Sequence, residues 1–264
     1  MVSDFTITIV FDNNPGVPEL IPKWGFAAAV AYDGHTLLFD TGGDGAVLLS
    51  NMAALGIDPQ AIEDVVLSHA HDDHTGGLQA LLAAGSNPAV HLLPSFPGRF
   101  KRRVATQTTV IETVPERQVA DGMFVTGEIA GKIPEQALVL ETGRGMVIIT
   151  GCAHPGVDRI VARARDLFER PVYLVLGGFH LGSANAGEIA QILSALREMG
   201  VQKVAPCHCT GERAIAAFAG EYGDDFIEAG PGRVIVVEST GVIEPGTASG
   251  TDGEQAAPIA HAHF

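Results

Sequence analysis

Three imidazoles and two carboxylates lie within six consecutive residues of this chain, in the segment HAHDDH at positions 69–74. Side chains two residues apart share one face of an extended strand, so His69 and His71 can bind one cation. A turn into a following helix would bring Asp73 and His74 beside them, where they can bind a second cation. Neutral imidazole and carboxylate ligands suit Zn²⁺, with Fe and Mn²⁺ as alternatives. Core packing gives no reason for such a cluster, and the segment therefore predicts a metal site.

Single histidines follow three strands that we expect later in the chain. They are His154 in TGCAHPG, His180 in LGGFHLG and His208 in PCHCTG. Residues just past the ends of neighbouring strands meet at one edge of a sandwich fold, which favours convergence of all three on the first cluster. Each histidine taken alone could instead be a loop residue that caps backbone groups.

The elements that would position these residues alternate between strands and helices. Apolar runs at 5–11, 24–31 and 35–39, with the turn Asp33-Gly34 between the last two, predict an antiparallel meander. The expected later strands are 63–67, 137–141, 145–150, 172–176, 203–205 and 234–237. The expected helices begin after Asp44, at 78–84, near Pro155, through 189–196 and at about 211–219. Each half of the chain therefore starts with strands and continues into strand-helix units.

This order of elements predicts an α/β fold in which two mixed β-sheets pack face to face with helices outside. We expect one domain over residues 1–245. Within it, the segment 94–134 has an irregular pattern, with β-like pieces around 109–113 and 123–126, and we interpret it as a flap. Residues 246–264 lack periodicity, which predicts a flexible tail whose His261 and His263 are incidental.

The composition limits the classes of partner. Of the 264 residues, 46% are hydrophobic and 18% are charged, which is ample for a large core. The formal net charge of −15 disfavours binding to nucleic acid or to an anionic membrane surface, because both are negatively charged. We therefore expect a small-molecule substrate and neither a nucleic-acid nor a membrane partner, and a homodimer stays an open alternative.

The chain also lacks signals for export. No apolar run approaches the roughly 18 residues that span a bilayer, and the N-terminal MVSDFTITIV has neither the basic region nor the cleavage site of a signal peptide. Three cysteines without such a signal argue for reduced thiols. These features predict a cytoplasmic protein.

The motifs resemble those of the metallo-β-lactamase superfamily, through Asp40 in LLFDTGG, the HAHDDH box and the later single histidines. More specifically, FDNNP, WGFAAAV, TGCAHPG, GGFHL and PCHCTG resemble the 7,8-dihydropterin-6-methyl-4-(β-D-ribofuranosyl)aminobenzene-5′-phosphate synthase family, which has a methanopterin-pathway name. The match runs from about residue 5 to residue 237. The resemblance implies an αββα sandwich of the metallo-β-lactamase type.

The resemblance also implies a set of metal ligands for two divalent ions. His69, His71 and His154 would hold the first ion, and Asp73, His74 and His208 the second. Asp40 would orient a metal-binding histidine by accepting its far N–H, or it could simply stabilise the turn before Gly42-Gly43. Many superfamily members have a bridging Asp where this chain has the segment GGFH at 177–180. Either His180 approaches the metals or the substrate, or water alone bridges the ions, and the second ion could bind less tightly.

Two divalent ions about 3.5–4 Å apart would lower the pKa of a shared water toward ~7 and polarise the substrate. We therefore expect a metal-bound hydroxide, oriented by Asp73, as the nucleophile, with His180 as the candidate for proton delivery or oxyanion support. The predicted activity is hydrolysis of a small-molecule phosphoester, lactone or ester. Two alternatives stay open: the condensation of a dihydropterin diphosphate with an arylamine ribose phosphate, and a non-enzymatic metal- or ligand-binding module.

Further residues are candidates for contact with the substrate. They are Asn14, Trp24, Phe26, Arg102, Arg103 and Thr210. The two aromatic residues, beside the turn that contains Asn14, could form a flat wall for a ring, and ordinary core packing is equally consistent. The basic run 99–103 could bind an anionic substrate, although a solvated strand edge is the favoured interpretation.

The helix that begins near Thr210 could present free backbone N–H groups to a phosphate or carboxylate, while Glu212 argues against a strongly anionic guest. Cys207 and Cys209 would point away from His208 if that segment is extended, so we interpret them as spectators. A loop would instead let one thiol join the site. Cys152, two residues before His154, has the same interpretation.

Overall fold

A computed structural model describes residues 4–115 and 117–239 of the chain. The first half supplies most of one sheet, whose strands are β1 (Phe5–Phe11), β2 (Ala27–Tyr32), β3 (His35–Phe39), β4 (Asp64–Val66), β5 (Ala89–Leu92), β6 (Val110–Glu112) and the late strand β13 (Val234–Val237). Among the described residues this sheet has seven strands in the order β13-β1-β2-β3-β4-β5-β6. Pairing is antiparallel from β13 to β3 and parallel from β3 to β6.

The second sheet comes mainly from the second half of the chain. Its strands are β7 (Arg117–Ala120), β8 (Met123–Val125), β9 (Leu138–Thr142), β10 (Gly145–Thr150), β11 (Val172–Gly178) and β12 (Lys203–Cys207). They form a six-stranded sheet over the described ranges, in the order β12-β11-β10-β9-β8-β7. The strands β10, β11 and β12 are parallel, so their carboxyl ends lie at one edge.

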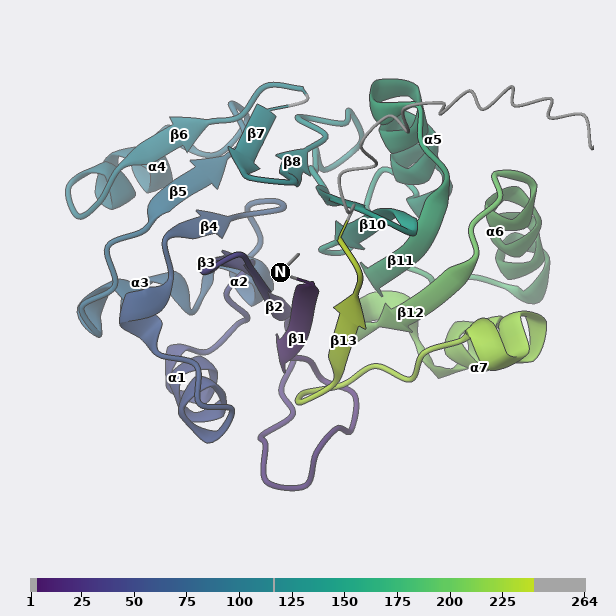
Figure 1. Cartoon of the computed structure of the whole chain (residues 1–264), viewed down its shortest axis with the longest axis horizontal. Coiled ribbons are helices and arrows are strands. Elements are labelled where there is room, and N and C mark those ends of the chain that lie inside the picture. The colour runs from purple at the N-terminus through teal and green to yellow at the C-terminus, as the bar shows by residue number, and fades with distance from the viewer. Residues whose placement is uncertain (1–3, 116, 240–264) are drawn as a thin grey trace, which may run out of the picture.

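Helices cover the outer faces of both sheets (Figure 1). They are α1 (Gly45–Ala54), α2 (Asp72–Thr75), α3 (Leu78–Ala83), α4 (Gly98–Ala105), α5 (Val157–Phe168), α6 (Ala186–Glu198) and α7 (Glu212–Tyr222), with short 3-10 turns η1 (Pro59–Ala61), η2 (His208–Thr210) and η3 (Gly223–Asp225). Asp44 caps α1 as expected, since its side chain accepts hydrogen bonds from the backbone N–H groups of Ala46 and Val47. The predicted α/β fold of two facing mixed sheets is confirmed.

Three apolar layers hold the sandwich together. The central layer lies between the sheets, and the two others lie between each sheet and its helices. In β10, Val147 and Ile149 face the central layer while Met146 and Ile148 face the helices, so the strand is buried on both faces. Each such side chain contributes about 1.5–3 kcal/mol by leaving water. This packing fixes the strand ends from which the site is built.

The segment 94–134 is not the flap that its irregular pattern predicted. It contributes α4 to the outside of the first sheet, β6 to the edge of that sheet, and β7 and β8 to the second sheet. The basic run at 99–103 lies on α4, so the prediction of a solvated strand edge is wrong. The proposed tail at 246–264 lies outside the described residues.

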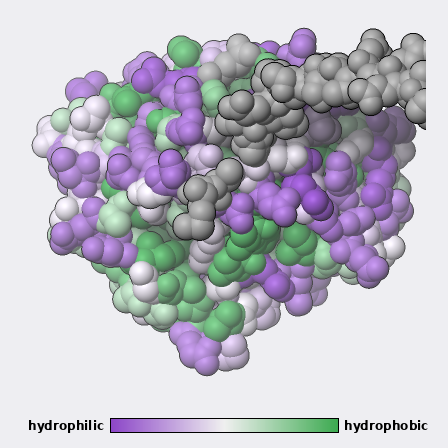
Figure 2. Space-filling model, viewed as in Figure 1, coloured by the Kyte–Doolittle hydropathy of each residue, from purple (hydrophilic) through white to green (hydrophobic). Residues whose placement is uncertain are grey.

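The surface shows no membrane-spanning element: none of the described helices combines the length and the apolar character that crossing a bilayer requires. Figure 2 shows hydrophilic and hydrophobic residues mixed over one face, with hydrophobic atoms over β13. In that edge strand Val234 and Val236 are at least half exposed.

Candidate metal centre

The HAHDDH box folds as a strand end followed by a single helical turn. β4 ends at Val66, and α2 begins three residues after His69, so that His71 is the N-cap of α2 and His74 lies within it. The carbonyl oxygen of His74 accepts hydrogen bonds from the backbone N–H (2.7 Å) and the Oγ1 hydroxyl (2.9 Å) of Thr41. These bonds tie α2 to the loop after β3 and fix the direction of the His74 ring.

A first cluster joins the box to the second half of the chain. The Nδ1 atom of His71 lies 3.1 Å from Nε2 of His69 and 3.3 Å from Nε2 of His154. One ring nitrogen from each of these three residues lies within 4.8 Å of the other two, so the three could hold one metal ion. His154 follows β10 in the second sheet, and the structure therefore brings together the three residues that the resemblance assigned to the first ion.

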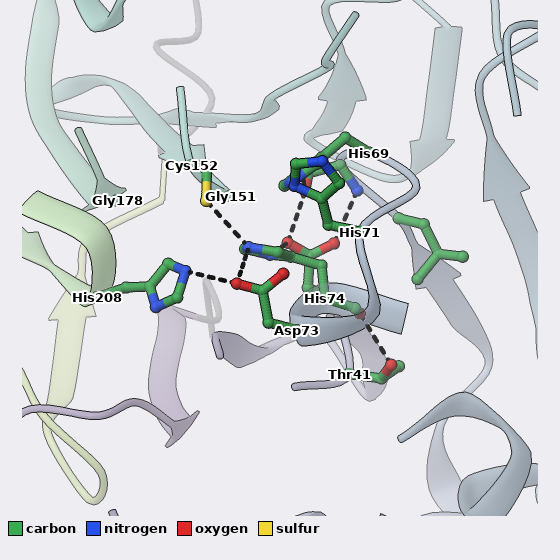
Figure 3. A network of polar contacts seen from close by, with 12 residues as sticks. Thr41, His69, His71, Asp73, His74, Gly151, Cys152, Gly178 and His208 are labelled. Carbon is green, nitrogen blue, oxygen red and sulfur yellow. Dashed lines mark hydrogen bonds and ion pairs between the residues drawn. The ribbon is translucent and has the colours of Figure 1, made fainter. Parts of the chain in front are cut away.

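A second cluster lies beside the first (Figure 3). Oδ2 of Asp73 is 3.8 Å from Nε2 of His74 and 3.4 Å from Nε2 of His208. Sγ of Cys152 lies 3.2 Å from Nε2 of His74. These four side chains form a second group whose candidate ligand atoms are within 4.8 Å of one another. The three residues assigned to the second ion thus meet as well, with a thiol among them.

The far nitrogen of each key ring is held by an outer partner. Nδ1 of His74 lies 2.7 Å from a carboxylate oxygen of Asp40, and Nδ1 of His208 lies 2.8 Å from the amide oxygen of Asn13. Because these oxygens accept hydrogen bonds, Nδ1 carries the proton and Nε2 of the neutral ring presents a lone pair to the cluster. Nε2 of His208 is buried and has no hydrogen-bond partner within the described part of the chain. A buried nitrogen acceptor that faces a carboxylate, a thiol and another imidazole fits a cation.

Asp40 has the geometry that the orienting role requires. Besides His74, it accepts hydrogen bonds from the backbone N–H and the hydroxyl of Ser68, both at 2.7 Å. Burial lowers the pKa of His74, but the charge and the hydrogen bond of Asp40 outweigh it and raise this pKa to about 9. By contrast, burial and the nearby His180 lower the pKa of His154 to about 4. The first cluster therefore favours neutral rings.

Glu135 is a buried carboxylate that the sequence did not single out. Oε1 accepts the backbone N–H groups of Gly151, Cys152 and Ala153 at 2.8–3.1 Å, and Oε2 accepts that of His154 at 2.9 Å. Burial raises its pKa to about 7. The side chain shapes the TGCAHPG loop, and nothing in the local pattern around Glu135 indicates a partner 16 residues or more away.

The FDNNP turn contributes residues other than the expected one. Asn13, rather than Asn14, contacts His208, and Asp12 accepts the backbone N–H of His208 at 3.1 Å. Burial raises the pKa of Asp12 to about 6. Asn14 is half-buried and donates its backbone N–H to Asp12. FDNNP was the available signal, although it did not indicate which amide reaches the site.

Two of the three cysteines lie at the site. Cys152 belongs to the second cluster, and Cys152, His180 and Cys209 form a third group of close potential ligand atoms. A hydrogen bond between the two thiols lowers the pKa of Cys209 and raises that of Cys152. The prediction that these two are spectators is wrong about their position, because 208–210 form a 3-10 turn instead of an extended segment. Cys207 does point away, into the central apolar layer.

His180 lies at the open side of the first cluster. Its ring centroid is 4.3 Å from that of His154, and its side chain is exposed. A hydrogen bond with Cys209 raises its pKa. His180 also has a left-handed backbone, with φ of 52°, which is uncommon for a residue other than glycine. The ring is therefore placed beside the metal positions without lying inside them.

The candidate substrate residues divide into two groups. Trp24 is 57% exposed and its ring centroid is 4.8 Å from that of His208, so it can line the entrance. Phe26 is fully buried in the central layer, and its assignment to a substrate wall is wrong. Thr210 is also fully buried: its hydroxyl donates to the carbonyl of Cys207 and accepts from the N–H of Phe179. A role for Thr210 in holding a substrate anion is therefore wrong.

The basic helix α4 borders a pocket next to the metal box. This pocket has a volume of about 610 Å³ and is lined by Arg99 and Arg103, and by Ala70 and Asp72 of the box. Arg102 is exposed and is not among its lining residues. Of the two arginines predicted to contact substrate, only Arg103 is close to the metal box.

The chain belongs to the metallo-β-lactamase superfamily, whose family model matches residues 25–176. It is 30% identical over 249 residues to the 7,8-dihydropterin-6-methyl-4-(beta-D-ribofuranosyl)-aminobenzene-5′-phosphate synthase of Methanocaldococcus jannaschii, covering 75% of this chain and 83% of the relative. A solved structure of Tm1679, described as a metal-dependent hydrolase of the beta-lactamase superfamily, matches with a TM-score of 0.73 and 30% identity over 88% of this chain and 98% of that one. Zn²⁺-bound PqqB from Methylobacterium extorquens shares the fold, with a TM-score of 0.58 and 14% identity over 87% of this chain and 99% of that one.

Proposed function

We propose that this chain is a hydrolase that uses two divalent metal ions to act on a small-molecule phosphoester, lactone or ester. The observation that carries the proposal is the buried Nε2 of His208, which has no hydrogen-bond partner in the described residues and faces Asp73. The similarity to Tm1679, which is itself described as a metal-dependent hydrolase, supports the reaction class.

Two sets of side chains would hold the ions. The first set is His69, His71 and His154, and the second contains Asp73, His74 and His208. Two such ions supply a Lewis acid for the substrate oxygen and a water of lowered pKa. Asp40 and Asn13 keep the histidine lone pairs directed at the ions through the hydrogen bonds to Nδ1.

The remaining site residues would bind the substrate and move protons. His180 lies exposed beside His154 and can donate a proton to the leaving group or support a developing negative charge. Trp24 offers an exposed aromatic surface next to His208, which suits a ring of the substrate. Arg103 and Arg99 border the neighbouring pocket and can attract an anionic group. The net charge of −15 supports a small molecule, and not nucleic acid, as the substrate.

A synthase is the second candidate. The similarity to the M. jannaschii synthase favours it, since the name of that relative describes a dihydropterin product. The same two metal positions would then serve a condensation between a dihydropterin diphosphate and an arylamine ribose phosphate. Release of diphosphate when both compounds are present would support this candidate over hydrolysis.

The test begins with the metal. We would measure the elements bound to protein purified without added metal, and then assay the protein loaded with that metal on panels of phosphodiesters, phosphomonoesters, lactones and esters. The proposal predicts two divalent ions per chain and turnover that a chelator abolishes. Full metal content without turnover on any panel, together with diphosphate release from the pterin pair, would contradict hydrolysis.

A further inference from the structure

The thiol of Cys152 is placed among the candidate ligands of the second ion. Cys152 is 3% exposed, and its Sγ lies 3.2 Å from Nε2 of His74. Figure 3 shows the sulfur pointing into the space between His74 and His208, opposite Asp73. The ligand atoms of these four residues all lie within 4.8 Å of one another, which is close enough for one ion.

The backbone holds this sulfur in position. Glu135 accepts the N–H groups of four consecutive residues, 151–154, and so fixes the loop on both sides of Cys152. Ala153 takes a left-handed conformation with φ of 59°, which turns the loop so that Cys152 and His154 face different clusters. The same loop therefore supplies one side chain to each metal position.

The neighbouring strand end cannot supply a ligand there. β11 ends in Gly177 and Gly178, and a Cβ atom on Gly178 would lie 2.4 Å from the carbonyl oxygen of Gly151 and 2.7 Å from Sγ of Cys209. Any side chain at position 178 would thus require the loop or Cys209 to move. The sulfur of Cys152 occupies this side of the second cluster instead.

The buried nitrogen of His208 is the second observation that points to a ligand. It has no hydrogen-bond partner among the described residues, although it faces Asp73 across 3.4 Å. A simple hydrogen bond between Cys152 and His74 would leave this nitrogen unsatisfied. A cation bound by all four side chains would satisfy the two nitrogens, the carboxylate and the sulfur together.

We propose that the thiolate of Cys152 is the fourth protein ligand of the second metal ion, with Asp73, His74 and His208, and that this position therefore prefers Zn²⁺ to Mn²⁺. On binding, the S–H bond breaks, its proton goes to solvent, and sulfur bonds to the metal. Thiolate ligands select Zn²⁺, whereas Mn²⁺ prefers oxygen ligands. The inference rests on the metal centre of the proposed function and does not depend on which reaction that centre performs.

The test uses the full chain loaded with Co²⁺, because a thiolate bound to Co²⁺ gives a charge-transfer absorption band in the near ultraviolet. The band and the number of bound Co²⁺ ions would be measured for the wild type, Cys152→Ser, Cys209→Ser and Cys207→Ser. The last is the matched control, since Cys207 is buried on the neighbouring strand but belongs to the central apolar layer. Titration with Zn²⁺ and Mn²⁺ would give the affinity of the second position.

We expect two Co²⁺ ions and the thiolate band in the wild type, Cys207→Ser and Cys209→Ser. In Cys152→Ser the band should disappear and the second Zn²⁺ should bind at least about 10-fold more weakly, the minimum loss typical of partners one layer further from a metal. The affinity for Mn²⁺ should change less. A band that survives in Cys152→Ser, or that only Cys209→Ser removes, would overturn the assignment.

The wild type provides a test that needs no variant to fold. X-ray absorption of the Zn²⁺-loaded chain should show sulfur at about 2.3 Å from zinc. Two bound Zn²⁺ ions with only nitrogen and oxygen neighbours would overturn the thiolate ligand and leave the two-metal centre intact. A chain that binds neither Co²⁺ nor Zn²⁺ would overturn both.

Discussion

At the scale of single residues, the side chains one layer outside the clusters decide which atoms face the metal positions. Asp40 binds Nδ1 of His74, and Asn13 binds Nδ1 of His208. Both choose the tautomer whose Nε2 is free to bind a cation. The affinity for metal therefore depends on residues that do not touch the metal.

Asp40→Asn should lower the affinity for the second metal ion by about 10–100-fold. The amide of Asn cannot accept all three hydrogen bonds that the carboxylate accepts from Ser68 and His74, so the His74 ring loses its fixed orientation. Competition with a fluorescent chelator measures this affinity. Asp64→Asn is the control, because Asp64 is also a buried carboxylate bound to a histidine, His91, but it begins β4 at the opposite end from the site. An unchanged affinity in Asp40→Asn would contradict the orienting role.

His180→Ala should lower kcat by about 100-fold or more, the range expected for loss of general acid-base catalysis, while both metal ions stay bound. The reason is that the ring lies against His154 without belonging to either cluster of metal ligands around Asp73. Turnover and metal content would be measured on the same preparation, with the remote His35→Ala as control. Loss of one metal ion would show instead that His180 is a ligand.

The sequence revealed those site residues that are concentrated in one motif or that follow a recognisable strand. HAHDDH and the later histidines are of this kind, and the structure brings them together. Glu135 and Asn13 escaped notice because each acts through a partner far away in the sequence. Phe26 was misassigned because an apolar residue after a turn has the same pattern whether it faces a site or the core.

At the scale of elements, the site depends on how closely strand ends approach one another. The loops after β10, β11 and β12 carry His154, His180 and His208, and the parallel pairing of these strands places the three loops side by side. Glycine at the end of β11 permits the contact, since Gly178 touches the loop after β10 and the residues after β12. A larger residue at this point would push the two metal positions apart.

Gly178→Ala should therefore destabilise the fold by about 1–3 kcal/mol, the range for overpacking a filled site. Gly220→Ala is the matched control, because a Cβ there meets nothing within 4 Å and Gly220 lies in α7, where alanine favours the helix by up to about 1 kcal/mol. Urea denaturation of the metal-free variants measures both free energies of unfolding. Equal stabilities for the two variants would show that β11 tolerates a side chain at its end.

Most strands and helices could be predicted from periodicity, since long apolar runs such as β10 and β11 leave little ambiguity. The region from β6 to β8 could not. Its strands have three or four residues each, too few for a clear alternation, and they pair with distant partners in two different sheets. Their place follows from tertiary packing, which no local pattern records.

At the scale of the whole molecule, the metal centre lies where the two halves of the sandwich meet. His69, His71 and His74 come from the first half, and His154 and His208 from the second. Bound metal would then link the two sheets and stabilise the folded state by mass action. The high negative charge of the chain repels large polyanions, while Arg99 and Arg103 leave one basic pocket beside the box.

The most direct test of the account is the metal content of the wild type beside His154→Ala and His208→Ala, measured by elemental analysis of folded, dialysed protein. We predict two ions per chain in the wild type and about one in each variant, because each histidine belongs to a different cluster. Circular dichroism would verify that the variants keep their fold. A wild type that binds no metal, or variants that both retain two ions, would contradict the claim that residues from both halves of the chain form one two-metal centre.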